Sequence, residues 1–177
     1  MSAVLTATNL NKRYGNQLAV DHVNLDIQPG RIIGLIGPNG SGKTTTLKAA
    51  LGLIPFDGEL KVLGFDPRTQ RDELMNNVCF IADVAVLPRW IKVSEVLDFV
   101  AGTHPKFSRS KAMAYLAKTK LKPDMKVKQM SKGMIVQLHL AIVMSIDAKL
   151  LVLDEPTLGL DILYRKQFYQ NLLEEYF

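Results

Sequence analysis

The 177 residues, 47% hydrophobic and 22% charged, suffice for one domain with a hydrophobic core and exclude a disordered chain. The net charge of +5 is mild and the Lys and Arg residues are scattered, so we expect a solvated surface and no nucleic-acid partner. The single cysteine, Cys79, excludes an internal disulfide framework and indicates a reducing compartment.

The N-terminal part of the chain is predicted to be mainly β structure. Apolar runs at residues 4–7 and 23–27 predict strands separated by a turn at residues 14–16. After Pro29-Gly30, the apolar run at residues 31–36 predicts another strand. The elements expected next are a helix at 45–51, a turn at 55–58, a strand at 59–63, a helix at 67–75 and a strand at 77–82.

From about residue 93 to residue 146 the pattern becomes helical. Val93, Val96, Leu97 and Val100 follow the i, i+3, i+4, i+7 spacing of an amphipathic helix. A continuous apolar run at residues 150–153 then predicts a buried parallel strand, and the remaining residues from 161 on are predicted to be helical. The most apolar stretch is far shorter than the roughly 20 residues of a membrane span, so we expect any membrane role to come from a partner. No signal peptide is recognised at the start of the chain.

A phosphate-binding motif follows the third apolar run. Residues 37–44 match G-x-x-x-x-G-K-[ST] at every fixed position, between a predicted strand and a predicted helix. Backbone N–H groups of such a loop point at an anion, Lys43 can reach the β- and γ-phosphates, and Thr44 can ligate Mg²⁺. An ordinary glycine-rich turn is the alternative. The residues expected to bind the nucleotide here are Gly37, Pro38, Asn39, Gly40, Ser41, Gly42, Lys43, Thr44 and Thr45.

Two carboxylates follow the apolar run at residues 150–153. Open α/β sheets bind ligands at the carboxyl ends of their strands, where Asp154 and Glu155 are expected to lie. Asp154 can hold Mg²⁺, directly or through water, and Glu155 can polarise the water that attacks the γ-phosphate. With Lys43, they are the predicted catalytic residues.

Ser131 is predicted to cap a helix. The N–H groups that follow it form a second candidate anion site, although Ser131 could equally serve only as a cap.

The order of these motifs resembles that of the ATP-binding subunits of ABC transporters over essentially the whole chain. Residues 130–134 look like the family's signature sequence, and Val-Leu-Asp-Glu-Pro-Thr with Gly159-Leu160-Asp161 looks like its second catalytic segment. Tyr14 resembles the aromatic residue that stacks on adenine, although alone it would more often be a strand-end aromatic. The resemblance implies an α/β fold of the P-loop NTPase type, with a mainly parallel core sheet, an antiparallel N-terminal β region and a helical subdomain.

The resemblance also implies an organisation and a set of partners. One domain is expected, with residues 1–86 and 147–177 as the nucleotide-binding core and residues 87–146 as the helical subdomain. ATP and Mg²⁺ are the implied cofactors. In a homodimer or pseudo-dimer, ATP would lie between the phosphate loop of one subunit and Ser131 and Gly133 of the other. The subunit would sit on the cytoplasmic face of the membrane, where roughly residues 87–130 contact an integral membrane permease.

Several positions depart from the family pattern. Lys132 and Met134 replace the second glycine and the glutamine of the signature, while Ser131 and Gly133 are intact. Asp83 stands where the family has a glutamine that senses the γ-phosphate and Mg²⁺, and its carboxylate remains a possible oxygen ligand for the metal.

The remaining departure concerns the end of the sequence and the histidines. Beyond the helix that follows Asp161, family members have another strand and a histidine that contacts the γ-phosphate. None of His22, His104 and His139 takes that place. We therefore expect a truncated form of a longer protein, with hydrolysis weak or absent. His139 is interpreted as a packed core or interface residue.

These features favour the energy-supplying subunit of a membrane transporter. The sequence Ser131-Lys132-Gly133-Met134 resembles drug- and peptide-exporting members, which favours a bacterial exporter. The alternatives are an ATPase of the same fold that serves no transporter, and a truncated nucleotide-binding or assembly module without turnover.

Overall fold

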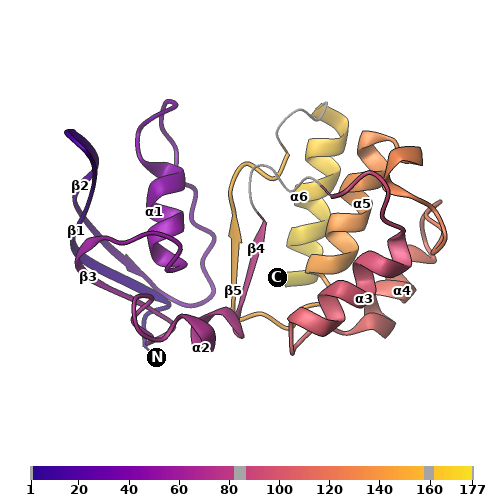
Figure 1. Ribbon diagram of the computed structural model, residues 1–177, viewed down its shortest axis with the longest axis horizontal. Helices are drawn as coiled ribbons and strands as arrows, with labels where there is room; N and C mark the ends of the chain where they lie inside the picture. Colours follow the sequence, from indigo (N-terminus) through magenta and orange to yellow (C-terminus); the bar gives the residue numbers. More distant parts are fainter. Residues whose placement is uncertain (1, 82–86, 158–161, 177) are drawn as a thin grey trace. The chain divides into compact units, whose positions relative to one another are not determined.

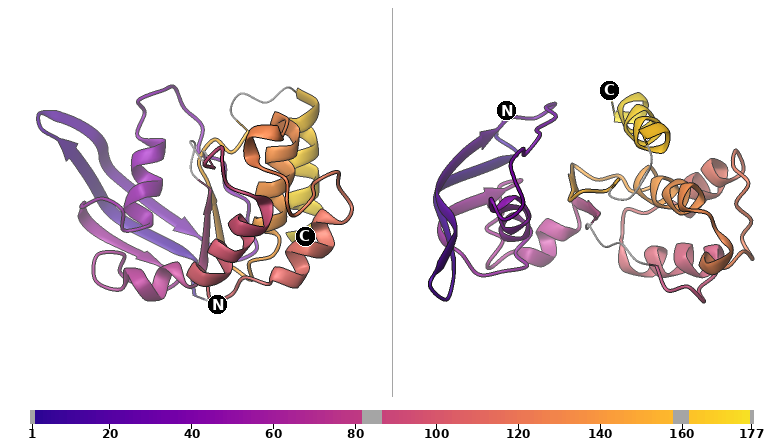
Figure 2. Two further views of the ribbon diagram at one scale, coloured as in Figure 1. Left: turned by 45° about the vertical axis from the view of Figure 1, so that its right-hand side comes forward. Right: turned by 90° about the horizontal axis from the view of Figure 1, so that it is seen from above.

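The chain is divided into two compact units (Figure 1, Figure 2). The computed structural model describes residues 2–81, 87–157 and 162–176. Unit 1 contains residues 1–78 and 149–154, and unit 2 contains residues 79–148 and 155–177. The predicted division into a core and a helical subdomain stays a prediction.

Unit 1 is built on a three-stranded antiparallel sheet, as predicted. Its strands are β1 (Leu5–Tyr14), β2 (Gln17–Ile27) and β3 (Asp57–Val62), in the order β2-β1-β3. Leu5, Ala7 and Leu10 are the buried residues of β1, with the irregular position Asn9 between the last two. Helix α1 (Lys43–Ala50) contacts β2 and β3 (Figure 2). The helix begins two residues earlier than predicted, at the lysine of the phosphate-binding motif.

The hairpin of β1 and β2 contains irregularities that side chains hold in place. Asn9 and His22 have positive φ values of 50° and 45°, which L-residues seldom adopt. The N–H of Asn9 donates to the side chain of Asn24, and that of His22 donates to the side chain of Asn11, both at 2.9 Å. These bonds satisfy backbone groups where the pairing register shifts. The hairpin thereby continues to its turn, beside Tyr14.

The predicted strand at residues 31–36 is not observed. Residues 31–38 have no strand assignment, and no strand in the described part of the chain pairs with them. Ile32 and Ile36 are 65% and 98% exposed. An apolar run of this kind is typical of a strand covered on both faces, but a strand also requires a neighbour to bond its N–H and C=O groups. The prediction was wrong because the sequence pattern carries no information about that neighbour.

The remaining strands follow the predictions more closely. The strands predicted at residues 77–82 and 150–153 are observed as β4 (Val78–Ile81) and β5 (Leu150–Leu153). Within unit 1, the N–H groups of Lys149 and Leu150 donate to the carbonyl of Asn77, at 2.9 and 3.3 Å. Helix α2 (Arg71–Met75) begins later than predicted, because Asp66 organises a turn ahead of it through bonds to Arg68 and Gln70.

Unit 2 contains a helical core. Helices α3 (Val93–Thr103), α4 (Arg109–Leu116) and α5 (Lys132–Val143) pack around a buried apolar cluster, and α6 (Ile162–Tyr176) contacts α5 (Figure 1). A short 3-10 helix, η1 (Val127–Gln129), precedes α5. Of the helices that the structure describes, none has the length and apolar character of a membrane span.

His139 is packed in this helical region, as predicted, and its Nε2 has no hydrogen-bond partner among the described residues. Burial lowers the pKa of the His139 imidazole below its ordinary value. The unfolded chain then takes up this proton at a higher pH than the folded chain. The free energy of unfolding should therefore fall as the pH drops below about 6.5.

Replacing His139 with leucine should make this loss of stability shallower, because the variant has no imidazole to protonate on unfolding. The measurement is urea unfolding of both chains at a series of pH values from neutral to mildly acidic. An equally steep loss in the variant would show that groups other than His139 carry the pH dependence.

Candidate nucleotide-binding site

The phosphate loop leads directly into α1 through Gly42, and a side chain at this position would clash with the backbone of β2. Gly42 has a φ of 88°, and a Cβ atom there would lie 2.3 Å from the carbonyl oxygen of Ala19. No side chain caps the helix, although the N–H of Thr46 bonds to the carbonyl of Gly42 at 2.8 Å. The helix therefore begins with N–H groups that no side chain occupies, as an anion-binding turn requires.

Lys43 is held against the loop that precedes it. Its ammonium donates to the carbonyl oxygens of Gly37 and Pro38, at 2.8 and 2.9 Å. The N–H of Ser41 also bonds to the Pro38 carbonyl, at 3.2 Å, which closes the loop on itself. These contacts place a positive charge at the loop, where the motif requires a cation for phosphate.

Thr44 and Asp154 meet within unit 1, although 110 positions separate them in the sequence. The Thr44 hydroxyl donates to the Asp154 carboxylate at 2.9 Å, and Asp154 is only 5% exposed. This contact joins the phosphate loop to the end of β5.

The paired oxygens of Thr44 and Asp154 fit Mg²⁺, a hard cation that takes oxygen ligands and usually only one or two from carboxylates. No group of three or more His, Cys, Asp or Glu in the described part of the chain suggests another metal. If Mg²⁺ binds here, Thr44 and Asp154 are the residues placed to hold it.

Glu155 follows Asp154 directly and has an exposed side chain in a strained backbone conformation. Its φ is 49°, in the left-handed region that costs an L-residue about 1 kcal/mol or more. Strain of this kind is often retained where a functional side chain must point in one direction. The position of Glu155 fits its predicted role, which stays a prediction.

Because of this strain, changing Glu155 to glycine should give a more stable chain than changing it to alanine. Glycine adopts a positive φ without a steric penalty, so we expect a difference of about 1 kcal/mol in the free energy of unfolding. Both variants lose the carboxylate, which makes alanine the matched control, and urea unfolding measures the difference. Equal stabilities would show that the backbone at Glu155 is not strained.

Tyr14 ends β1 and is 48% exposed, which leaves part of its ring available for stacking on a base. The ammonium of Lys12 lies 5.0 Å from the centroid of the Tyr14 ring, a cation–π contact. Sequence reasoning did not identify Lys12. The available signal was its position two residues before Tyr14, which places both side chains on one face of the strand.

Ser131 is the N-cap of α5, as predicted. Its hydroxyl accepts the N–H of Met134 at 3.2 Å, and Gly133 is buried in the first turn. Both residues belong to unit 2, and their cap geometry is compatible with a purely structural role as well as with nucleotide binding. The predicted residues Asp83 and Asp161 lie outside the described residues.

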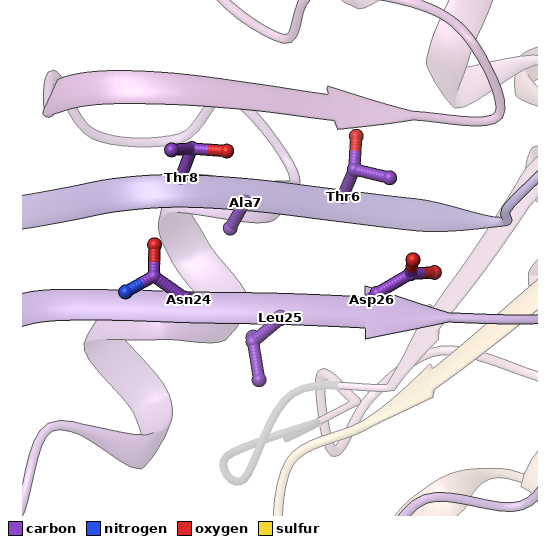
Figure 3. A pocket seen from close by; sticks show the side chains of 6 residues that line it. All are labelled: Thr6, Ala7, Thr8, Asn24, Leu25 and Asp26. Atoms are coloured by element: carbon purple, nitrogen blue, oxygen red, sulfur yellow. The ribbon is translucent and has the colours of Figure 1, made fainter.

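Two other features carry no part of this site. Cys79 is buried, and burial raises the pKa of its thiol to about 12, so the reactive thiolate is scarce at neutral pH. A surface hollow on β1 and β2 is lined by residues of the hairpin alone, and none of them is a predicted nucleotide ligand (Figure 3). The lining residues are Thr6, Ala7, Thr8, Asn24, Leu25 and Asp26.

Curated proteins similar to this chain are ATP-binding proteins of exporters and transporters. Nod factor export ATP-binding protein I of Cupriavidus metallidurans is 34% identical, over 97% of this chain and 59% of that protein. Bacitracin transport ATP-binding protein BcrA of Bacillus licheniformis is 34% identical, over 91% of this chain and 54% of that protein. SkfA peptide export ATP-binding protein SkfE of Bacillus subtilis is 35% identical, over 97% of this chain and 73% of that protein. The chain thus spans little more than half of the first two relatives.

Solved structures confirm the predicted fold class. An ATP binding subunit of an ABC transporter matches 98% of this chain and 75% of its own, with a TM-score of 0.82 at 24% identity. The cbiO1 protein from Clostridium perfringens matches 99% of this chain and 74% of its own, with a TM-score of 0.79 at 22% identity. The family model described as ABC transporter matches residues 20–158. The chain belongs to the ABC transporter family, among its ATP-binding proteins.

Proposed function

We propose that this chain binds ATP with Mg²⁺ and hydrolyses it to power a bacterial ABC exporter. The observation that carries the proposal is the contact between Thr44 and Asp154, which brings a phosphate loop and a buried carboxylate together. Family membership supports ATP as the nucleotide. The relatives named for the export of Nod factor and of SkfA peptide support export as the direction of transport.

In this proposal, Lys43 neutralises the β- and γ-phosphates, and Thr44 and Asp154 would hold the Mg²⁺ ion. Glu155 orients and polarises the attacking water, and Tyr14 stacks on the adenine. Mg²⁺ supplies charge neutralisation at the phosphates when it is bound. Hydrolysis converts one bound anion, ATP, into two separate anions, ADP and phosphate. The contacts that hold the nucleotide are then weaker.

Further residues would act from a second ATPase subunit. Ser131 and Gly133 would contact the γ-phosphate bound to the partner subunit, and Asp161 would lie beside the attacking water. Within its own subunit, Asp83 would join the cation ligands. ATP would then hold two subunits together, and its hydrolysis would release them and move a permease. The complex would assemble on the cytoplasmic face of the membrane, with residues 87–130 against the permease.

Purification from the source cells tests this function. The chain, tagged and cross-linked in intact membranes, should recover one integral membrane protein with several spanning helices. Recovery should rise when Glu155→Gln is used, because a complex that binds ATP without turnover persists for longer. Recovery of ribosomal or DNA-repair components would instead support an ABC-type ATPase outside transport. Recovery of no membrane protein in either case would overturn the proposal.

A further inference from the structure

The helical unit carries a concentration of positive charge that neither the nucleotide site nor the fold requires. Residues 118–132 contain six lysines and one acidic residue, Asp124. Lys118, Lys120, Lys122 and Lys128 are exposed, and no acidic side chain pairs with them within the residues that the structure describes. Lys132 starts α5 beside Ser131 and therefore belongs to the helix start, not to this concentration of charge.

Two segments of unit 2 run antiparallel and bring this charge together with an exposed aromatic side chain. The N–H of Val127 bonds to the carbonyl of Ile91, and that of Val93 to the carbonyl of Met125, both at 3.0 Å. The N–H of Lys128 bonds to the carbonyl of Arg89 at 2.9 Å. We call this pair of segments, residues 89–94 and 122–128, the basic junction.

The side chains of the basic junction separate into an inner and an outer set. Val93 and Val127 are buried in the helical core. Lys92 and Lys126 form the bridge between the two segments, and directly opposite residues of an antiparallel pair project to the same face. Trp90, two residues before Lys92, is 69% exposed. The outer face therefore presents an indole among ammonium groups.

The outer face of the basic junction is unfavourable for the stability of the folded chain. Like charges directly opposite in a strand pair repel, and a large exposed aromatic contributes little to stability. The one acidic residue of the junction, Asp124, leaves the four lysines of the junction in excess. Of the acids that follow on α3, Glu95 accepts the backbone N–H of Lys92 at 2.8 Å and Asp98 pairs with Arg109 at 2.8 Å. When a surface departs from the rules of folding stability in this way, it indicates that the surface binds another molecule.

We propose that the basic junction docks directly on the anionic headgroups of a lipid bilayer, with Trp90 placed at the headgroup level. Tryptophan is enriched at membrane interfaces, and lysines near an anionic leaflet are attracted to it electrostatically. Lysine also keeps its charged end in water while its stem covers apolar surface. Protein–protein interfaces are enriched in arginine and depleted of lysine, so the composition favours lipid over an acidic protein. The inference goes beyond the proposed function: within the region proposed to face the permease, the basic junction is the part that contacts lipid directly, and this contact requires neither nucleotide nor permease.

Trp90 is the only tryptophan of the chain, so its fluorescence reports on this surface alone. The probes are vesicles of phosphatidylcholine, with and without phosphatidylglycerol, mixed with the full 177-residue chain. We expect the emission of Trp90 to shift to shorter wavelength with the anionic vesicles only. The shift should disappear at about 1 M salt, where the screening length is about 3 Å.

The test variant is Lys126→Gln with Lys128→Gln, and the control is Lys61→Gln with Lys166→Gln, which removes the same charge from exposed lysines elsewhere. Vesicle flotation should show about 10- to 30-fold weaker binding for the test variant and a change of less than about twofold for the control. Equal weakening of both would show that net charge alone attracts the vesicles, and would overturn the assignment to the basic junction.

Two further outcomes would also overturn the proposal. One is the absence of any shift with anionic vesicles. The other is a shift of Trp90 emission with soluble polyglutamate or duplex DNA but not with vesicles, which would assign the surface to an acidic protein or a nucleic acid. Because the assay contains no nucleotide, failure of ATP binding would leave its result intact, and failure of vesicle binding would leave the proposed ATPase function untouched.

Discussion

Replacing Lys43 with alanine is expected to remove at least about half of the stabilisation of the chain by Mg²⁺-ATP. A ligand that binds only the folded state at 100 times its dissociation constant adds about 2.7 kcal/mol to the free energy of unfolding. Lys43 supplies the positive charge at the phosphate loop, where its ammonium lies 2.8 Å from the Gly37 carbonyl. A hydrogen bond to a charged group contributes about 1.5–3 kcal/mol, so its loss should weaken ATP binding by roughly 10- to 150-fold. Thermal melts by circular dichroism, with and without Mg²⁺-ATP, measure the effect.

Lys48→Ala is the matched control, because Lys48 is an exposed lysine in the last turn of the same helix. This variant should keep the full ATP-dependent rise in melting temperature. Lys43→Ala should melt close to the original chain without nucleotide, since its side chain contacts only loop carbonyls. An unchanged ATP shift in Lys43→Ala would place the nucleotide elsewhere and contradict the assignment of the phosphate loop.

The elements that carry the candidate nucleotide site were predictable in outline because they are encoded locally. The glycines around Lys43 determine a turn, Ser131 determines a helix start, and the apolar run before Asp154 determines a buried strand. The contact of Thr44 with Asp154 also followed from a general rule, since ligand-binding residues gather at the carboxyl ends of strands. The turn, the helix start and the strand each depend on a few neighbouring residues, whereas the contact joins residues 110 positions apart.

Features that depend on pairing between distant segments were not predictable in this way. Residues 31–36 have the composition of a strand, but their strand character depends on a neighbour that the pattern does not specify. The prediction of scattered lysines overlooked the run of lysines from residue 118 on, and the bridge that places Lys92 opposite Lys126 depends on pairing between two distant segments. Lys12 was missed because its contact is with a ring and not with an acid.

Changing Asp154 to asparagine is expected to make ATP binding much less dependent on Mg²⁺. Asparagine keeps an oxygen that can accept the Thr44 hydroxyl, so the contact between the phosphate loop and β5 should survive. It removes the negative charge that attracts a divalent cation, and we expect the metal to bind about 10- to 100-fold more weakly. Calorimetric titration of ATP, with Mg²⁺ and with EDTA, should show a large difference for the original chain and a small one for the variant.

Variants of Thr44 distinguish the loss of the cation from the loss of the hydrogen bond between Thr44 and Asp154. Thr44→Ser keeps the hydroxyl and should retain the dependence on Mg²⁺. Thr44→Val removes the hydroxyl and leaves the buried Asp154 carboxylate without this donor, which should cost about 1–3 kcal/mol of folding stability in addition to the cation. If Asp154→Asn and the original chain lose the same affinity in EDTA, then Asp154 does not hold the cation. Its bond to Thr44 would then serve only to anchor the loop.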